Sequence, residues 1–320
     1  MRILLTGSSG WLGRFLAPRL RSLGHDVIGF DIAAGTQTQV RGSVADRARV
    51  ERVFVDYQPQ AVIHAGALHK PDIARYPAQA FIDTNVTGTL NLLEAATAAG
   101  HDRFIFTSTT SLMISDAIRR ETAEHAVWLD ETVGPLDPRN IYGVTKLAAE
   151  GLCRIAYLEH GLNCIILRTA RFFPEEDDTH RDLSGENMKA NELLYRRLTV
   201  EDAAEAHVMA LDQAPAIGFG TYILSAPTPF RREDAEALKL DTASLIARQF
   251  PEAEALYAAR GWRLPVSIGR VYDAGAAERD LGFRPRTDFA AVLAALKSGG
   301  PLPFEHDPDY ISPKETGGAG

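Results

Sequence analysis

A tyrosine and a lysine stand four positions apart, at Tyr142 and Lys146, in a segment whose apolar residues recur at helical spacing up to residue 157. Side chains four positions apart lie on one face of a helix, where a lysine ammonium favours the phenolate and lowers the pKa of the tyrosine. Such a pair can take the proton from an alcohol while hydride leaves the same carbon, or return the proton to a carbonyl. A Tyr and a Lys one turn apart are also common on plain helix surfaces, so a cofactor site elsewhere has to decide between these interpretations.

A glycine turn near the start of the chain indicates such a cofactor site. Residues 6–13 read TGSSGWLG, between an apolar run and a helical pattern. Gly7 can adopt the left-handed dihedrals of a tight turn, Gly10 lets the backbone approach a pyrophosphate, and Gly13 lets the helix pack closely on the strand. The amides at the helix start then face the phosphates. A second apolar run ends at Asp31, where an acid accepts hydrogen bonds from an adenosine ribose.

The elements that position these residues follow an alternating pattern. Five strand-like apolar runs alternate with helical segments through the first half of the chain, which indicates a parallel sheet with helices on both faces. Right-handed crossovers then give a doubly wound α/β fold, followed by a smaller α/β lobe for the substrate. The expected strands are 3–5, 27–30, 61–64, 104–106, 164–167 and 221–224, and the expected helices are 45–57, 81–99, 142–157, 200–211, 235–250 and 274–281.

The chain divides into three parts on this pattern. We assign residues 1–170 to a Rossmann domain, whose core also receives residues 198–225. Residues 171–197 and 226–303 are less regular, with prolines between short helices, and form the substrate lobe. Residues 304–320 hold acids, prolines and a Gly-Gly-Ala-Gly end, so we expect a flexible tail there.

Composition excludes several classes of partner. The 320 residues carry a formal net charge of −8, and 45% of them are hydrophobic, which is enough for a large core. A nucleic-acid backbone or an anionic membrane requires a basic face, so neither is expected as a partner. Only Cys153 and Cys164 are present, which argues against a disulfide framework and against a zinc site. No apolar stretch approaches the roughly 20 residues of a membrane helix, and we expect a cytoplasmic protein.

In combination, the motifs resemble the extended short-chain dehydrogenase/reductase family, in its NAD-dependent epimerase/dehydratase group. They are the glycine turn, Asp31, HAGA at 64–67, FTSTT at 106–110 and YGVTK at 142–146. The resemblance covers roughly the first 211 residues and implies NAD as the cofactor and a carbohydrate as the substrate. Asp31 favours NAD because its charge would repel a 2′-phosphate. The cofactor-binding residues implied are Gly7, Ser9, Gly10, Trp11, Leu12, Gly13, Asp31, Ser43, Val44, His64, Ala65, Gly66, Ala67, Asn85, Thr107, Tyr142, Lys146 and Arg168, although His64 also suits a packing role.

The family's third catalytic residue is a Ser or Thr that closes the strand before the Tyr/Lys helix. Register from Phe106 selects Thr109 among several hydroxyls, and its hydroxyl would donate to the substrate oxygen beside Tyr142. Dehydratases of the family carry an Asp-Glu pair directly after the catalytic Thr. Thr110 and Ser111 stand at those positions here, and neither can perform carboxylate acid–base chemistry. Sugar dehydration is therefore disfavoured.

Arg171 is a candidate substrate-binding residue. It stands where the family usually has an Asn. An arginine there can clamp a carboxylate or a phosphate with two parallel hydrogen bonds. The alternative is that Arg171 only pairs with the acids 175–178. The segment that follows is short and resembles that of uronate dehydrogenases more than that of nucleotide-sugar epimerases. The other substrate contacts that we infer are His69, Thr109, Thr110 and Arg197, with Arg196 beside it.

Three activities remain open at this point. The first is a sugar dehydrogenase that forms NADH, and the second is a nucleotide-sugar epimerase whose NAD stays bound. The third is a non-catalytic NAD-binding protein, against which the intact Tyr142 and Lys146 count. The resemblance also implies a homodimer formed through helices 85–99 and 142–159, and the sequence gives both of them apolar faces.

Overall fold

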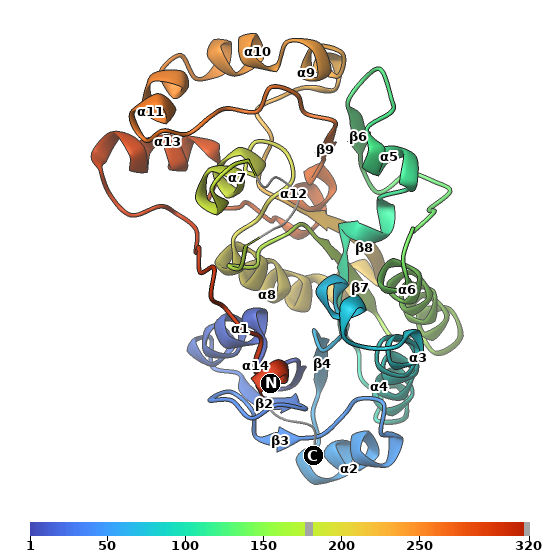
Figure 1. Ribbon diagram of the computed structural model, residues 1–320. Coiled ribbons are helices and arrows are strands. Elements are labelled where there is room, and N and C mark those ends of the chain that lie inside the picture. Colours follow the sequence, from blue (N-terminus) through green and yellow to red (C-terminus); the bar gives the residue numbers. More distant parts are fainter. Residues whose placement is uncertain (177–181, 317–320) are drawn as a thin grey trace.

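A sheet of seven parallel strands forms the centre of the molecule, in the order β3-β2-β1-β4-β5-β7-β8 (Figure 1). The computed structural model describes residues 1–176 and 182–316. The order changes direction between β1 and β4, and in such sheets ligands bind at this point, beyond the carboxyl ends of the strands. The strands are β1 (Arg2–Thr6), β2 (Asp26–Asp31), β3 (Val40–Arg41), β4 (Ala61–His64), β5 (Phe104–Thr109), β7 (Cys164–Thr169) and β8 (Phe219–Leu224).

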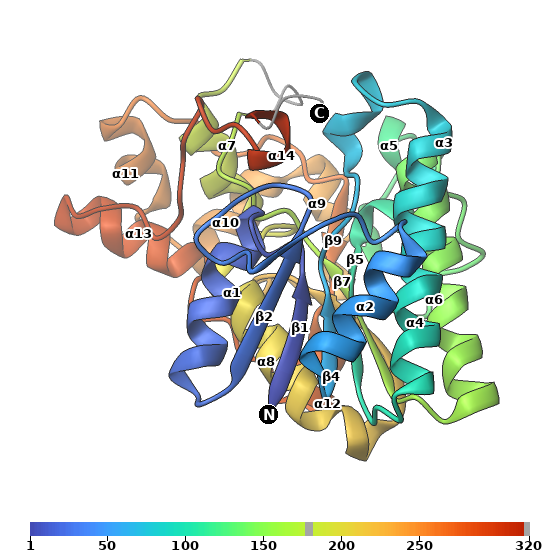
Figure 2. The same cartoon turned by 90° about the horizontal axis from the view of Figure 1, so that it is seen from below.

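Helices cover both faces of this sheet, which confirms the doubly wound α/β fold (Figure 2). Side chains alternate along each strand between the two apolar layers: Ile3 and Leu5 of β1 pack into one layer, and Leu4 packs into the other. All three are fully buried, so the strand is apolar throughout. One face carries α1 (Trp11–Ser22), α8 (Val200–Ile217) and α12 (Gly275–Leu281), and the other carries α2 (Arg47–Tyr57), α4 (Gly88–Ala98) and α6 (Ile141–His160).

Two of the expected helices are interrupted. The segment 81–99 consists of α3 (Ala78–Phe81), a π-helical stretch (Ile82–Thr87) and α4. The π-helical stretch holds Asn85, whose side chain bonds to the backbone of Leu68, and such wide turns are frequent at functional sites. The segment 235–250 likewise divides into α9 (Ala237–Leu240) and α10 (Thr242–Gln249).

A smaller lobe stands beside the carboxyl ends of the strands and has its own apolar core. Tyr257, Trp262 and Phe289 form edge-on or tilted ring pairs in this core. The sequence assigned residues 1–170 wholly to the Rossmann domain, but β6 pairs in parallel with β9 of the smaller lobe. The elements of this lobe and its surroundings are α5 (Asp116–Arg120), β6 (Val127–Leu129), α7 (Gly185–Glu192), α9, α10, α11 (Ala253–Ala259), β9 (Arg270–Tyr272) and α13 (Phe289–Ser298).

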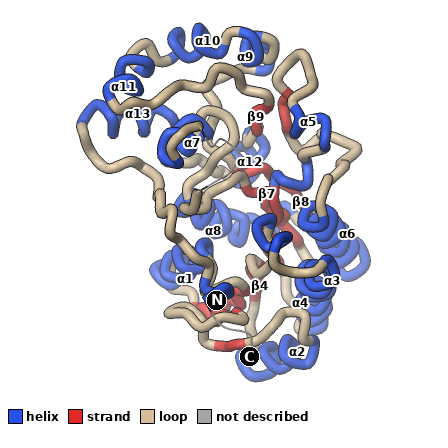
Figure 3. Tube along the Cα trace, viewed as in Figure 1, coloured by secondary structure: helices blue, strands red, loops and turns tan. Residues whose placement is uncertain are grey.

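The C-terminal segment differs from the flexible tail that composition suggested. From α13 it runs as a loop back to the Rossmann domain and ends in α14 (Pro313–Thr316) (Figures 1 and 3). Tyr310 packs edge-on against Trp11, with ring centroids 5.1 Å apart, and Lys314 pairs with Asp72. These two contacts attach the C-terminal segment to the Rossmann domain, although its composition predicts a flexible tail. Residues 317–320 lie outside the described part of the chain. Among the described helices, none has both the length and the apolar character that a membrane crossing requires.

Candidate active site

Two adjoining cavities open at the carboxyl ends of the central strands. The smaller, about 200 Å³, is lined by the glycine turn, Asp31 and the loop after β4. The larger, about 820 Å³, is lined by the end of β5, the start of α6 and the smaller lobe. Gly10, Ala65, His69 and Thr107 belong to the walls of both cavities, so a single extended ligand can occupy the two.

The glycine turn has the geometry that a dinucleotide diphosphate needs. Gly7 has φ of +71°, and its amide donates to the Phe30 carbonyl oxygen at 3.0 Å. A Cβ at Gly13 would lie 2.3 Å from the Gly7 carbonyl oxygen, so only glycine lets the helix approach the turn this closely. Gly10 is the N-cap of α1 without a side-chain cap, and no acid lies in the first turn. The amides of α1 are therefore available to an anion.

Asp31 ends β2 at the far end of the smaller cavity. Its carboxylate accepts from the Ser9 amide at 3.0 Å and from the Ala33 amide at 2.9 Å. These bonds fix the orientation of the Asp31 carboxylate. The carboxylate lies where a residue that binds the adenosine ribose is expected. Other implied cofactor residues that line a cavity are Ser9, Gly10, Trp11, Leu12, Ser43, Val44, Ala65, Gly66, Ala67, Thr107, Tyr142 and Lys146.

Replacing Asp31 by Asn is expected to weaken NAD binding about tenfold, because the ribose then loses hydrogen bonds to a charged group. NADP binding should fall less or improve, since the repulsion of the 2′-phosphate is removed. Calorimetric titration of both nucleotides measures this. Asp26→Asn, at the opposite end of the same strand, is the matched control. An NAD/NADP preference that stays at the wild-type ratio would contradict the assignment of Asp31.

Three residues that sequence reasoning placed at the cofactor lie behind the cavity walls instead. His64 bonds Thr6 at 2.7 Å through Nδ1 and Thr89 at 3.0 Å through Nε2. Burial lowers its pKa to about 3, so it is a neutral packing residue at neutral pH. Asn85 holds the loop after β4, accepting from the Leu68 amide at 2.9 Å.

Arg168 is the third. Its Nη2 donates to the Glu150 Oε2 at 2.7 Å and its Nε to the Glu150 Oε1 at 3.0 Å, and both side chains are buried between β7 and α6. Motif position alone does not reveal this partner, because Glu150 reaches Arg168 only through the packing of α6 on the sheet. Gly13 does not line either cavity. Its role is to let α1 pack closely on the glycine turn.

Tyr142 occupies the first turn of α6, where the Asn140 side chain caps the helix by accepting from the Gly143 amide at 2.9 Å. It lines the larger cavity and is 7% exposed. Burial raises the pKa of Tyr142 to about 12, and a hydrogen bond with Thr109 lowers it by a smaller amount. Helical spacing alone predicts that Lys146 lowers this pKa. In the structure, burial dominates.

Lys146 lies one turn further along α6 and also lines the larger cavity. Its Nζ donates to the Thr107 carbonyl oxygen at 2.8 Å and lies 4.7 Å from the centre of the Phe106 ring. Burial lowers the pKa of Lys146 to about 7, so its positive charge is only partial near neutral pH. The charge of Lys146 is not among the causes that shift the pKa of Tyr142, in contrast to what the helical spacing suggested.

The hydroxyls at the end of β5 have different partners, which separates their roles. Thr107 bonds the His207 ring at 2.8 Å, Ser108 donates to Glu150 at 2.6 Å, and Thr110 donates to the Thr169 carbonyl oxygen at 3.3 Å. Thr109 lines the larger cavity with Tyr142, its Oγ1 accepts from the Ser111 amide at 3.1 Å, and it is the one of these four that lowers the pKa of Tyr142. This is consistent with the choice of Thr109.

On the substrate side, Arg171 lines the larger cavity together with Glu175 and Glu176. Attraction to Arg171 lowers the pKa of Glu175, but burial raises it by more. Asp177 and Asp178, the other acids considered as partners for Arg171, lie outside the described residues. Thr109, Thr110 and His69 also line this cavity.

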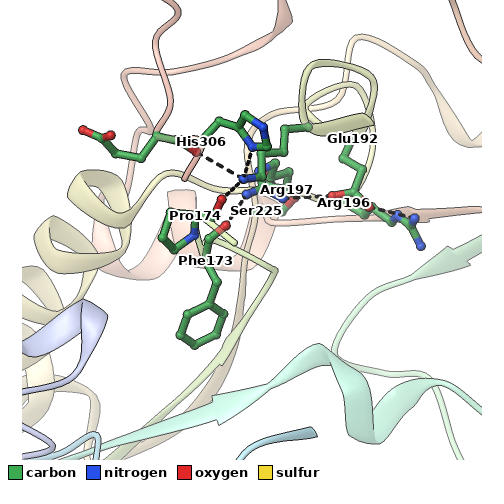
Figure 4. Close-up of polar contacts among 9 residues, drawn as sticks. Phe173, Pro174, Glu192, Arg196, Arg197, Ser225 and His306 are labelled. Carbon is green, nitrogen blue, oxygen red and sulfur yellow. Dashed lines mark hydrogen bonds and ion pairs between the residues drawn. The ribbon is translucent and has the colours of Figure 1, made fainter. Parts of the chain in front are cut away.

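Arg197, in contrast, does not line the cavity. It donates to Glu192 at 3.0 Å and to the Phe173 carbonyl oxygen at 2.7 Å, and it is 1% exposed (Figure 4). Its neighbour Arg196 is the one that lines the cavity, paired with Glu192 at 2.8 Å. Arg196 lies in the turn after α7, where its amide donates to the Glu192 carbonyl oxygen at 2.8 Å, whereas Arg197 forms a parallel bridge with Arg171.

Sequence reasoning missed a group of arginines in the larger cavity. Arg119, Arg139 and Arg270 line it from α5, from the loop before α6 and from β9. Burial lowers the pKa of Arg139, and repulsion from Arg119 and Arg270 adds to this. The Nε of Arg270 is buried without a hydrogen-bond partner. In the sequence, only Arg270 stands in a stretch that resembles the family, Arg-Val-Tyr-Asp at 270–273. Arg119 and Arg139 belong to no recognisable motif, so the sequence offered no reason to place them in the site.

Fold and site together define a Rossmann protein whose dinucleotide cleft continues into a polar pocket. The chain belongs to the NAD dependent epimerase/dehydratase family, whose model matches residues 3–222. NAD is the cofactor of that family, and the glycine turn, the free amides of α1 and Asp31 fit it.

Similar proteins agree with this assignment. The UDP-glucose 4-epimerase of Rhizobium meliloti (strain 1021) is 30% identical over 174 residues, which are 52% of this chain and 50% of that protein. The chain thus matches about half the length of this relative. The crystal structure of a Thermus thermophilus UDP-glucose 4-epimerase in complex with NAD shares the fold, with a TM-score of 0.62, 21% identity and coverage of 93% of this chain and 99% of that one. A mutated uronate dehydrogenase also shares it, with a TM-score of 0.62, 19% identity and coverage of 97% and 89%.

Proposed function

We propose that the protein is an oxidoreductase that transfers hydride between a carbohydrate carbinol and NAD, with Tyr142, Thr109 and Lys146 as its catalytic residues. The observation that carries the proposal is that Tyr142 and Thr109 line the same cavity, which shares wall residues with the dinucleotide cleft. A phenol and a hydroxyl that meet there can share one substrate oxygen. The family's cofactor supplies the hydride acceptor.

The catalytic residues divide the proton chemistry. In the reductive direction, the neutral Tyr142 phenol donates its proton to the carbonyl oxygen while hydride from NADH adds to the same carbon, so the substrate gains two electrons and becomes a carbinol. Oxidation is the reverse and requires Tyr142 to lose its proton first, which its pKa of about 12 favours at alkaline pH. Thr109 donates a hydrogen bond to the substrate oxygen and stabilises its developing charge. Lys146, when protonated, adds positive charge below Tyr142 and favours the phenolate.

The proposed substrate carries an anionic group. The larger cavity presents Arg139, Arg171, Arg196 and Arg270. Guanidinium groups bind carboxylate and phosphate with paired hydrogen bonds. Both a uronate and a nucleotide sugar have such a group, and they correspond to the similar proteins described above.

A second candidate is a nucleotide-sugar epimerase in which NAD stays bound and no net oxidation occurs. The identity with UDP-glucose 4-epimerases favours it, and the 820 Å³ cavity has room for more than a free sugar. A non-catalytic NAD-binding role is disfavoured by the intact catalytic residues. Because Cys153 and Cys164 are free and buried, the reducing cytoplasm remains the proposed compartment.

A substrate panel tests the proposal. The protein is incubated with NAD and, separately, free uronates, aldoses and UDP-hexoses, while NADH absorbance and the sugar products are followed. Net NADH with one class identifies a dehydrogenase, and interconverted sugars without net NADH identify an epimerase. Failure to convert any of the three classes would contradict the proposed reaction.

We also propose a homodimer formed through α4 and α6. These helices pack against each other and expose Leu90, Val144, Ile155 and Leu158. A paired interface would bury these side chains. Sedimentation velocity at micromolar concentration should show twice the chain mass of 34.9 kDa. A single species of monomer mass would remove the proposal.

A further inference from the structure

The C-terminal segment 305–316, here called the strap, crosses the mouth of the cofactor site. It begins beside the smaller lobe, where Lys189 bonds the Glu305 carbonyl oxygen at 3.5 Å and the His306 ring at 3.0 Å. The Asp307 amide donates to the Pro174 carbonyl oxygen at 2.9 Å. Figure 4 shows His306 beside Pro174 at this anchor. The start of the strap is therefore fixed to the substrate-side loop.

The end of the strap is fixed to the Rossmann domain. Tyr310 packs on Trp11 of the glycine turn, and Lys314 pairs with Asp72, whose side chain is 2% exposed. Asp72 is itself held in place, because it accepts from the His69 amide at 2.6 Å. With both ends attached, the strap places its side chains at a defined position over the cleft.

Ser312 and Lys314 line both cavities, as Gly10 and Trp11 of the glycine turn also do. A dinucleotide that extends from Asp31 to Tyr142 must pass this junction, and its diphosphate lies at the start of α1. The strap thus faces the glycine turn across the path of the diphosphate.

Lys314 supplies positive charge to the smaller cavity. Among the described residues that line this cavity, Lys314 is the only lysine or arginine, and Asp31 is the only acid. The Lys314 side chain is 12% exposed. A lysine ammonium has three donors, and Asp72 accepts one of them. The remaining donors can bond phosphate oxygens without breaking the pair.

From this placement, we propose that Lys314 is a cofactor-binding residue, which contributes a positive charge to the diphosphate of NAD from the C-terminal strap. It completes a diphosphate site in which the amides of α1 act from one side and the ammonium from the other.

Calorimetric titration of NAD, ADP-ribose and adenosine tests this role. Lys314→Met should weaken NAD and ADP-ribose about tenfold, because each loses a charge-assisted hydrogen bond, and should leave adenosine unchanged. Lys314→Arg should recover most of the affinity. Lys297→Met, at an exposed lysine in the last turn of α13, is the matched control.

Unchanged NAD affinity in Lys314→Met would overturn the proposal. Equal losses for adenosine and ADP-ribose would also overturn it, since they would show that the strap only covers the cleft. Thermal unfolding checks that each variant is folded. If Lys314→Met unfolds, Lys314→Gln repeats the comparison with a donor that lacks the charge.

Discussion

Tyr142→Phe is expected to lower kcat by about 10²- to 10⁴-fold, which is the contribution of a positioned general acid–base group. The ring and its packing are kept, and only the phenol oxygen in the larger cavity is removed. NAD affinity should remain within about twofold, because the interactions of the diphosphate and ribose are unchanged. Steady-state kinetics on the substrate found in the panel, with NAD titration of the same variant, measures both.

Tyr157→Phe is the matched control, since Tyr157 lies on the same helix, stacks on Phe219 and lines neither described cavity. It should retain wild-type turnover. A Tyr142→Phe variant with wild-type kcat would mean that the proton is handled elsewhere, and the catalytic assignment of Tyr142 would be wrong.

The largest effect on stability is expected from Glu150→Ala, which should lower the free energy of unfolding by about 3–5 kcal/mol. Glu150 accepts from Ser108 at 2.6 Å and from two nitrogens of Arg168. Without it, a guanidinium that is 8% exposed keeps its charge and loses its partner. Urea denaturation of the NAD-free protein measures the change.

Two further variants make this test specific. Glu150→Ala/Arg168→Met should recover part of the loss, because it removes the unpaired charge. Glu159→Ala, at the exposed end of α6, should change stability by less than about 0.5 kcal/mol. If Glu150→Ala had no more effect than this control, Arg168 would not depend on Glu150, and a role at the cofactor would again be open.

Features set by local chemistry could be predicted from the sequence. The positive φ of Gly7, the close packing of Gly13 and the position of Asp31 follow from a short stretch of chain, as does the helix that carries Tyr142 and Lys146. Each depends on residues within a few positions or on a repeated pattern, which a sequence displays directly.

Features set by long-range packing could not be predicted. Arg168 resembled a cofactor ligand until its contact with Glu150 was known. Adjacent arginines at 196 and 197 look alike in sequence, but Arg196 lines the larger cavity and Arg197 donates to the distant Phe173 carbonyl oxygen. The pKa of Tyr142 depends on burial by several elements, and the strap depends on contacts between distant residues, such as that of Lys314 with a residue 242 positions away.

The central claim is that hydride passes between a carbohydrate and NAD at Tyr142, and stopped-flow absorbance of enzyme-bound NADH tests it most directly. Wild-type protein mixed with NAD and a sugar that it converts should show NADH, either accumulating or as a transient. The same experiment with Tyr142→Phe should show the signal slowed by about 10²-fold or more. Conversion of the sugar without any NADH signal in the wild type, or an unslowed signal in Tyr142→Phe, would contradict the account.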